Sequence, residues 1–167
     1  MLRMARWVLI YLLGFLPQTF LLLYAALGLV GARAGSRRLA VPAATLGLVA
    51  LMLRPTLSQG WYIPVSMAIL VASLMLFRLA STLEAVAAAA IGFILIAAGD
   101  LFVMAPTFYL LGFSYDQVVE SPRLYVVFGS LEGTFLAVAA LLVRVKAVTV
   151  VSISRWEKVL AQRRAGK

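Results

Sequence analysis

The chain has 167 residues, of which 64% are hydrophobic and only 13% are charged, and its formal net charge is +9. A soluble domain of this length is close to half apolar and about one quarter charged, so the composition excludes a water-soluble protein and predicts one membrane-embedded domain. The sequence contains no histidine and no cysteine, which excludes imidazole and thiolate metal sites, Ser–His and Cys–His catalysis, and disulfides.

Five apolar segments follow one another along the chain and predict an all-α integral membrane bundle of about five transmembrane helices over residues 1–144. The segments are Trp7–Val30, Leu39–Leu53, Tyr62–Phe77, Ala85–Gly112 and Leu124–Val143. The first is longer than the core of a signal peptide, so we expect it to be retained as a spanning helix. The second and third, at about 15 to 16 residues, are short for a hydrocarbon layer of ~30 Å.

Residues 145–167 form a basic cytoplasmic tail that differs in composition from the apolar segments. Its last part, "RWEKVLAQRR", places Trp156, Val159 and Leu160 on one helical face with cations around them. This pattern favours a short amphipathic helix that lies against anionic lipids, and a frayed basic tail is the alternative. The residues expected to contact the membrane surface or a partner are Arg155, Trp156, Lys158, Arg163 and Arg164.

The distribution of lysine and arginine predicts the orientation in the membrane. With five spans and the tail in the cytoplasm, only Arg3, Arg6, Arg54 and Arg123 lie outside, and the other eleven cations lie inside. We therefore expect a multi-pass protein of the cytoplasmic membrane with a cytoplasmic C-terminus. The direction of the first span stays open, because Arg3 and Arg6 oppose it. The charge of +9 is attributed to this bias and to anionic lipid, not to nucleic acid.

Three polar side chains, Gln18, Asp100 and Glu132, interrupt the apolar segments. Counted from the loop that joins the fourth and fifth segments, Asp100 and Glu132 lie within about 6 Å of one level at 1.5 Å per residue. Charge at mid-membrane costs roughly 2.5–3.5 kcal/mol on insertion scales, so we expect these groups to face the protein interior. A ligand or proton site and a purely structural contact, including a pair with Arg54 or Arg123, both stay open.

Prolines and small residues lie beside these polar groups. Pro17 and Pro106 are expected to kink their helices next to Gln18 and Asp100 and to free backbone carbonyls. Around Glu132, the small residues Gly129, Gly133 and Ala137 recur every four positions. Such a stripe predicts the close approach of another helix, either from this chain or from a second copy.

The sequence resembles a known family in the order of several features. These are "LPQTFLLLYAALGLVGARAGSRR", the short segments around "RPTLSQGWYIPV", the long segment in "AAGDLFVMAPTFYLLGFSYDQVVESPRL", and the exit "ALLVR". Together they are similar to the membrane-embedded sensing region of accessory-gene-regulator-type and related GHKL-class sensor histidine kinases. That family carries its phosphorylated histidine and ATPase domain after the last span, whereas this chain has no histidine. The resemblance therefore implies a sensory module whose output needs a partner kinase or another protein.

Three functions follow as hypotheses. The first is a stand-alone sensory, signalling-type or partner-binding membrane module, and the second is a substrate-binding or proton-coupled transport component. The third is a scaffold subunit of a membrane complex, with another membrane subunit or a second copy as partner. The sequence contains no Gly-rich phosphate loop, no GxSxG motif and no metal-ligand spacing, so we expect neither an enzyme nor a cofactor.

Overall fold

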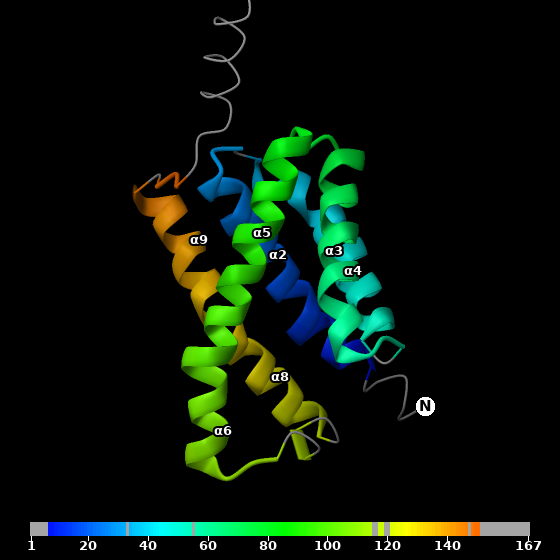
Figure 1. Ribbon diagram of the computed structural model, residues 1–167, viewed down its shortest axis with the longest axis vertical. Coiled ribbons are helices and arrows are strands. Elements are labelled where there is room, and N and C mark those ends of the chain that lie inside the picture. The colour runs from blue at the N-terminus through cyan, green and yellow to red at the C-terminus, as the bar shows by residue number, and fades with distance from the viewer. Residues whose placement is uncertain are drawn as a thin grey trace, which may run out of the picture.

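The structure, a computed structural model, describes residues 7–32, 34–54, 56–114, 117–118, 121–146 and 148–150. Every regular element in this part of the chain is a helix, as Figure 1 shows, which confirms the predicted all-α class. The predicted amphipathic helix of the basic tail, with Arg155, Trp156, Lys158, Arg163 and Arg164, lies outside the described residues.

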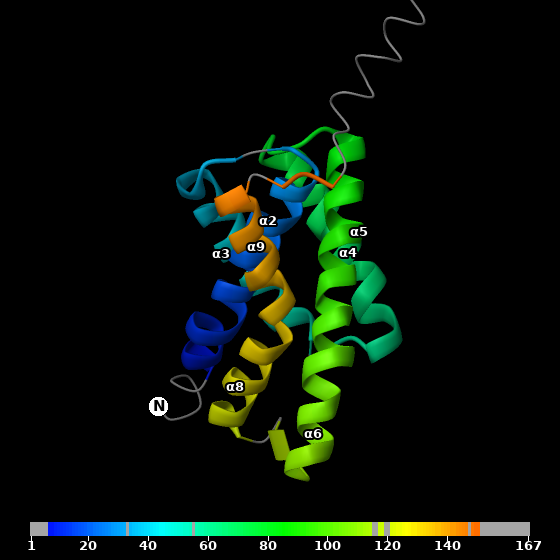
Figure 2. The same cartoon turned by 90° about the vertical axis from the view of Figure 1, so that its left-hand side faces the viewer.

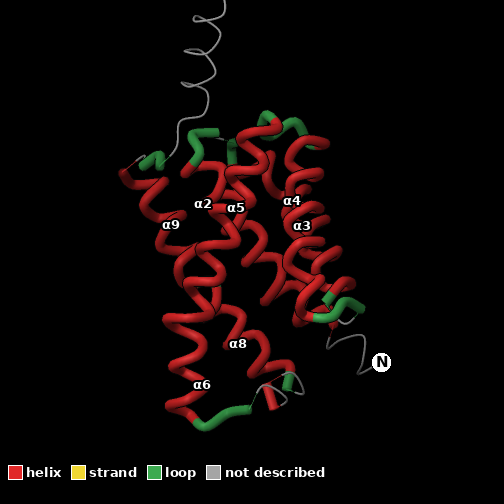
Figure 3. Tube along the Cα trace, viewed as in Figure 1, coloured by secondary structure: helices red, strands yellow, loops and turns green. Residues whose placement is uncertain are grey.

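The helices follow the apolar segments of the sequence closely. They are the π-helical turn η1 (Tyr11–Phe15), α2 (Leu16–Leu29), α3 (Ser36–Leu53), α4 (Gln59–Leu76), α5 (Thr82–Gly99), the π-helical turn η2 (Asp100–Met104), α6 (Ala105–Leu111), α8 (Pro122–Glu132) and α9 (Thr134–Lys146). Figure 3 shows that α5, η2 and α6 continue one another as a single long rod. The cap of α5 explains its start, because Ser81 and Glu84 form a reciprocal capping box.

Three helices are long and apolar enough to cross a membrane: Trp7–Leu29, Ser36–Leu53 and Thr82–Leu111. A fourth crossing results if the helices Arg123–Glu132 and Thr134–Lys146 cross together, with a bend of 48° between them. The apolar helix Trp61–Leu76 is shorter. The structure therefore agrees with a membrane-type helical bundle of three or four clear spans and does not establish the predicted number of five.

The predicted continuous fifth segment, Leu124–Val143, is wrong in one respect, because it is broken at Gly133. This residue ends α8 with φ −72° and ψ 0°, which stops the regular helix. The hydroxyl of Thr134 donates to the carbonyl of Leu131 at 2.6 Å, and Ser130 donates to Val126 at 2.8 Å. Hydroxyls of this kind compete with backbone donors and favour bends in membrane helices.

Successive helices run in alternating directions around α2, which contacts α3, α5 and α9 (Figures 1 and 2). Packing is close where α2 meets α5 and α9, and it depends on small side chains. A Cβ atom on Gly28 would collide with Val143, and one on Gly92 would collide with Leu22. Close backbone approach through such residues gives dispersion contacts in lipid, where helices gain no hydrophobic driving force from each other.

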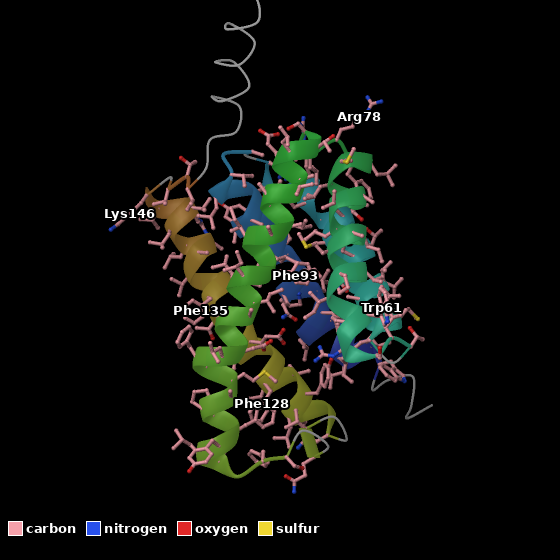
Figure 4. All side chains as sticks on the ribbon, in the orientation of Figure 1. Trp61, Arg78, Phe93, Phe128, Phe135 and Lys146 are labelled. Atoms are coloured by element: carbon pink, nitrogen blue, oxygen red, sulfur yellow. The ribbon has the colours of Figure 1, made fainter. Side chains whose placement is uncertain are left out.

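One end of the bundle carries most of the described cations. The end of α4 is followed by Arg78, and α9 ends with Lys146, and Figure 4 shows both side chains at the same end of the molecule. Arg37 and Arg38 lie in the first turn of α3, which begins at this end in Figure 1. We call this the cation-rich end.

Candidate functional site

A cavity of about 600 Å³ lies between η1, α2, α3, α4, α5, η2 and α8. Its polar lining consists of Gln18, Thr19, Arg54, Tyr62, Ser66, Asp100 and Glu132. The structure therefore brings together all three polar residues that the sequence analysis singled out. It adds four that the analysis did not place in a site, of which only Arg54 had been considered as a pairing partner.

Two π-helical turns border this cavity, and in each case a proline is the second residue after the turn. Because proline has no N–H and its ring collides with the carbonyl four residues earlier, an α-helix cannot continue regularly through it. Here the helix widens instead: the N–H of Leu16 bonds to the carbonyl of Tyr11, and that of Ala105 bonds to Asp100. The expected disturbances at Pro17 and Pro106 thus take the form of π turns, which recur at functional sites.

Gly99 brings the two carboxylates near each other. A Cβ atom at this position would collide with the backbone carbonyl oxygen of Glu132, so α5 and α8 touch backbone to backbone there. The next residue is Asp100, the first of η2, and Glu132 is the last residue of α8 before the bend. This contact explains why Asp100 and Glu132, which are 32 positions apart in the sequence, line the same cavity.

The carboxylates have different surroundings. The Glu132 side chain is hydrogen-bonded to the side chain of Gln18 and interacts electrostatically with Asp100 and Arg54. Asp100 interacts electrostatically with Arg54 and is more exposed than Glu132. Asp100 therefore lies toward the open side of the cavity, and Glu132 lies deeper, between α2 and α5.

Arg54 is held from two directions. Its guanidinium carbon lies 5.1 Å from the ring centroid of Tyr125 and 6.0 Å from that of Phe15, distances at which a cation is attracted by the aromatic face. On its other side the charge interacts with Asp100 and Glu132. Of the two arginines considered as partners, Arg54 lines the cavity, whereas Arg123 is exposed and does not.

Three hydroxyl residues of the cavity had escaped the sequence analysis. Thr19 donates to the carbonyl of Phe15 at 2.7 Å and to that of Ala43 at 3.0 Å, which joins α2 to α3. Tyr62 and Ser66 lie one turn apart on α4 and interact, but the buried Ser66 oxygen has no hydrogen-bond partner within 3.5 Å in the described part of the chain. Their four-residue spacing on an apolar helix was the available signal.

The predicted helix-packing stripe, Gly129, Gly133 and Ala137, does not take part in the cavity lining. No atom of the described chain lies within 4 Å of a Cβ built on Gly129, and Ala137 is exposed. Gly133 is buried at the bend, where the nearest atoms are the carbonyl oxygens of Ser130 and Gly129. Among the described residues, then, no helix packs closely on Gly129 and Ala137, and a second chain remains the predicted partner.

The site offers carboxylates, one guanidinium, an amide and hydroxyls as ligand groups. The described residues contain no group of three or more aspartate or glutamate side chains placed to hold a metal ion. Comparison with protein-family models, with curated proteins and with solved structures finds no match to this chain. Its function is therefore argued from the cavity.

Proposed function

We propose that the chain is a sensory or partner-binding membrane module that binds a small ligand in its cavity. The observation that carries this proposal is the cavity itself, because about 600 Å³ lies among seven helical elements, within the usual range of roughly 300–1,000 Å³ for small-molecule sites. Polar groups that served only to hold helices together would contact one another directly. Here Gln18 and Glu132 do so, whereas Asp100 lines the cavity with an exposed side chain.

The proposed protein crosses the cytoplasmic membrane five times and has its C-terminus in the cytoplasm. The short helix Trp61–Leu76 and the bent pair α8–α9 are then both spans. The cation-rich end faces the cytoplasm, since lysine and arginine are enriched on that side of membrane proteins. This arrangement agrees with the resemblance to sensing regions of GHKL-class kinases.

The bend at Gly133 connects ligand binding in the cavity to the position of α9 at the cytoplasmic end. Glu132 contacts the cavity, the chain bends by 48° directly after it, and α9 then runs to Arg144 and Lys146. A ligand shifts such an equilibrium only as far as it binds one arrangement better than the other. Contacts with Glu132 that depend on the bend angle supply that difference, and a partner at the cation-rich end reads the result.

A transport component is the second candidate, favoured by the interrupted helices. Discontinuous helices around a charged mid-membrane site are typical of secondary transporters, and η1, η2 and the break at Gly133 all border this cavity. The scaffold hypothesis depends on Gly129, Gly133 and Ala137 and does not involve the cavity. Uptake that survives neutralisation of both Asp100 and Glu132 argues against the transport candidate.

The absence of native cysteine allows a direct test of the cavity. Ser66→Cys places a thiol in the lining, and Ala68→Cys places one on an exposed position of the same helix, outside the lining. In lipid nanodiscs, a neutral methanethiosulfonate reagent should modify the first at least about tenfold faster, because a thiol must ionise in water to react. Equal rates at the two positions would refute a solvent-filled binding cavity.

Signalling is tested by filling the cavity covalently. Hydrogen–deuterium exchange is measured for Thr134–Lys146 before and after Ser66→Cys is modified with the benzyl form of the same reagent. A sensory module should show altered exchange near the bend, whereas the modified Ala68→Cys control should not. Identical exchange with a filled and an unfilled cavity contradicts the signalling part of the proposal and leaves binding intact.

A further inference from the structure

The charged groups of the cavity do not balance. Asp100 and Glu132 line it with Arg54, and no other lysine or arginine among the described residues is part of the lining. Two carboxylates thus face one guanidinium. Charges beside apolar walls interact more strongly than charges in bulk water, so with both acids ionised the lining favours one additional positive charge.

The polar side chains of the lining gather toward one end of the cavity, and the other end is lined by apolar side chains alone. On α4 the lining runs from Tyr62 and Ser66 to Leu70, and on α5 it runs back from Asp100 to Phe93. Eight residues of helix correspond to about 12 Å. The polar groups of α4 and of the α5–η2 rod therefore lie toward one end of the cavity, where Ile63 also lies, and the far end is apolar.

The remaining two helices follow the same order. Gln18 precedes Leu22 on α2, and Arg54 lies at the end of α3, eight residues beyond Leu46. Leu22, Leu46, Leu70 and Phe93 form the apolar end, and Figure 4 shows Phe93 on the side of α5 that faces α3 and α4. A molecule about 12 Å long with one polar head and one apolar body matches this lining.

We infer that the cavity recognises an apolar monocation, such as an aliphatic or aromatic ammonium compound, whose head lies between Asp100 and Glu132. This inference rests on the proposed binding function and specifies its ligand class. An ammonium group donates three hydrogen bonds and accepts none, which suits two carboxylates, the Tyr62 oxygen and the Ser66 oxygen. Its apolar body extends toward Phe93 and Leu70.

Arg54 acts as a built-in competitor of this ligand. Its guanidinium interacts with the same two carboxylates, and it also lies over the rings of Tyr125 and Phe15. The contacts with the two rings keep the arginine side chain in place when a ligand ammonium group forms hydrogen bonds with the carboxylate oxygens.

The charge preference is measured with Ser66→Cys in nanodiscs. Cationic 2-aminoethyl and anionic 2-sulfonatoethyl methanethiosulfonate are compared with the neutral reagent, and each rate is divided by the rate with glutathione. We expect the normalised cation rate to exceed the normalised anion rate by about tenfold. Glu132→Gln should reduce this ratio, whereas Glu84→Gln, an acid-to-amide change outside the cavity, should leave it unchanged.

Ligand class is then tested by protection. Adamantan-1-amine, adamantan-1-ol and adamantane-1-carboxylate share one apolar body and differ in the head. The amine should slow the neutral labelling of Ser66→Cys at concentrations at least about tenfold lower than the other two. The inference is overturned if all three compounds protect equally, if the carboxylate protects, or if the anionic reagent reacts faster than the cationic one. Labelling by the neutral reagent would still support a binding cavity.

The competitor role has its own variants. Arg54→Gln should lower the amine concentration needed for protection by roughly three- to tenfold, and Arg54→Lys should change it less than twofold. The neutral labelling rate shows whether the cavity survives each change. If Arg54→Gln abolishes protection by the amine while the neutral labelling rate is unchanged, competition by Arg54 is contradicted. If the neutral reagent does not label Ser66→Cys even with Arg54 in place, the proposed function itself is contradicted.

Discussion

Near the cation-rich end, α2 and α5 are in contact through alanine and glycine. Farther from that end, the same two helices are separated by a polar cavity. In the first region Ala26, Ala88 and Ala89 are almost fully buried, and Gly92 accommodates Leu22. In the second, η1 and η2 interrupt the helices and Asp100 faces open space. The bundle therefore combines a close-packed end with a hollow one.

The comparison shows that short side chains and helix breaks have opposite uses in one membrane protein. Glycine at position 28 or 92 removes volume so that helices approach, and their dispersion contacts stabilise the packed end. Pro17, Pro106 and Gly133 interrupt the helical hydrogen bonding around the cavity. Buried apolar contacts of this kind make the packed end the more stable part of the bundle, and the hollow end, with fewer of them, is the part to which the proposed ligand binding belongs.

The largest expected effect is the removal of packing volume from the close-packed end. Leu74 is almost fully buried in the same cluster as Ala88 and Ala89, so Leu74→Ala should lower the free energy of unfolding by about 3 kcal/mol. Leu46→Ala removes the same atoms from the cavity wall, where fewer neighbours are lost, and should cost less than half as much. Unfolding in mixed micelles measures both, and equal losses contradict the division into a packed and a hollow end.

The contact between α5 and α8 is tested by adding a single methyl group. Gly99→Ala should destabilise the protein by about 2 kcal/mol, because the new Cβ meets the carbonyl of Glu132 and backbone cannot move aside easily. Gly129→Ala is the matched control, since nothing lies within 4 Å of its Cβ. It should gain up to about 1 kcal/mol from helix propensity. A neutral Gly99→Ala variant would show that the helices do not touch there.

The hydrogen bond between α2 and α3 should have a smaller effect. Thr19→Val keeps the shape of the side chain but removes the donor to Phe15 and Ala43, which should cost about 1 kcal/mol. Thr45 is exposed and its hydroxyl bonds only within its own helix, so Thr45→Val should be near neutral. The same micelle unfolding assay compares them, and equal effects would show that the bond across the helices contributes nothing of its own.

The apolar segments predicted the helices within a few residues, because apolar length reports burial in lipid directly. The expected segment Leu39–Leu53 lies within the helix Ser36–Leu53, for example, and the expected Tyr62–Phe77 differs from Gln59–Leu76 mainly at its start. The shared level of Asp100 and Glu132 followed from the rise per residue. The structure agrees, since Gly99 packs on the backbone of Glu132.

What the sequence could not provide is the rotation of each helix about its axis. Depth placed Asp100 and Glu132 together, but only the packing shows that Tyr62 and Ser66 face them from α4. The break at Gly133 also escaped, because a glycine within an apolar run serves close packing as well as bending. Whether a glycine does one or the other depends on neighbours that are distant in sequence.

The change in stability expected for Glu132→Gln is small, and its sign distinguishes a structural role of the polar residues from a role in ligand binding. Glutamine keeps the size of the side chain and can still bond to Gln18, but it removes one negative charge beside Asp100. If the acid serves stability through Arg54, the variant should lose about 1 kcal/mol or more.

If the acid serves binding, the same variant should be neutral or more stable by up to about 1 kcal/mol, because repulsion between the carboxylates is relieved. It should at the same time lose protection by adamantan-1-amine. Unfolding in mixed micelles and the labelling assay on Ser66→Cys measure the two properties on one protein. Stability that falls while protection persists would assign Glu132 to the frame of the bundle, whereas the opposite combination assigns it to the hollow end, where charge is retained at the expense of stability for the sake of a ligand.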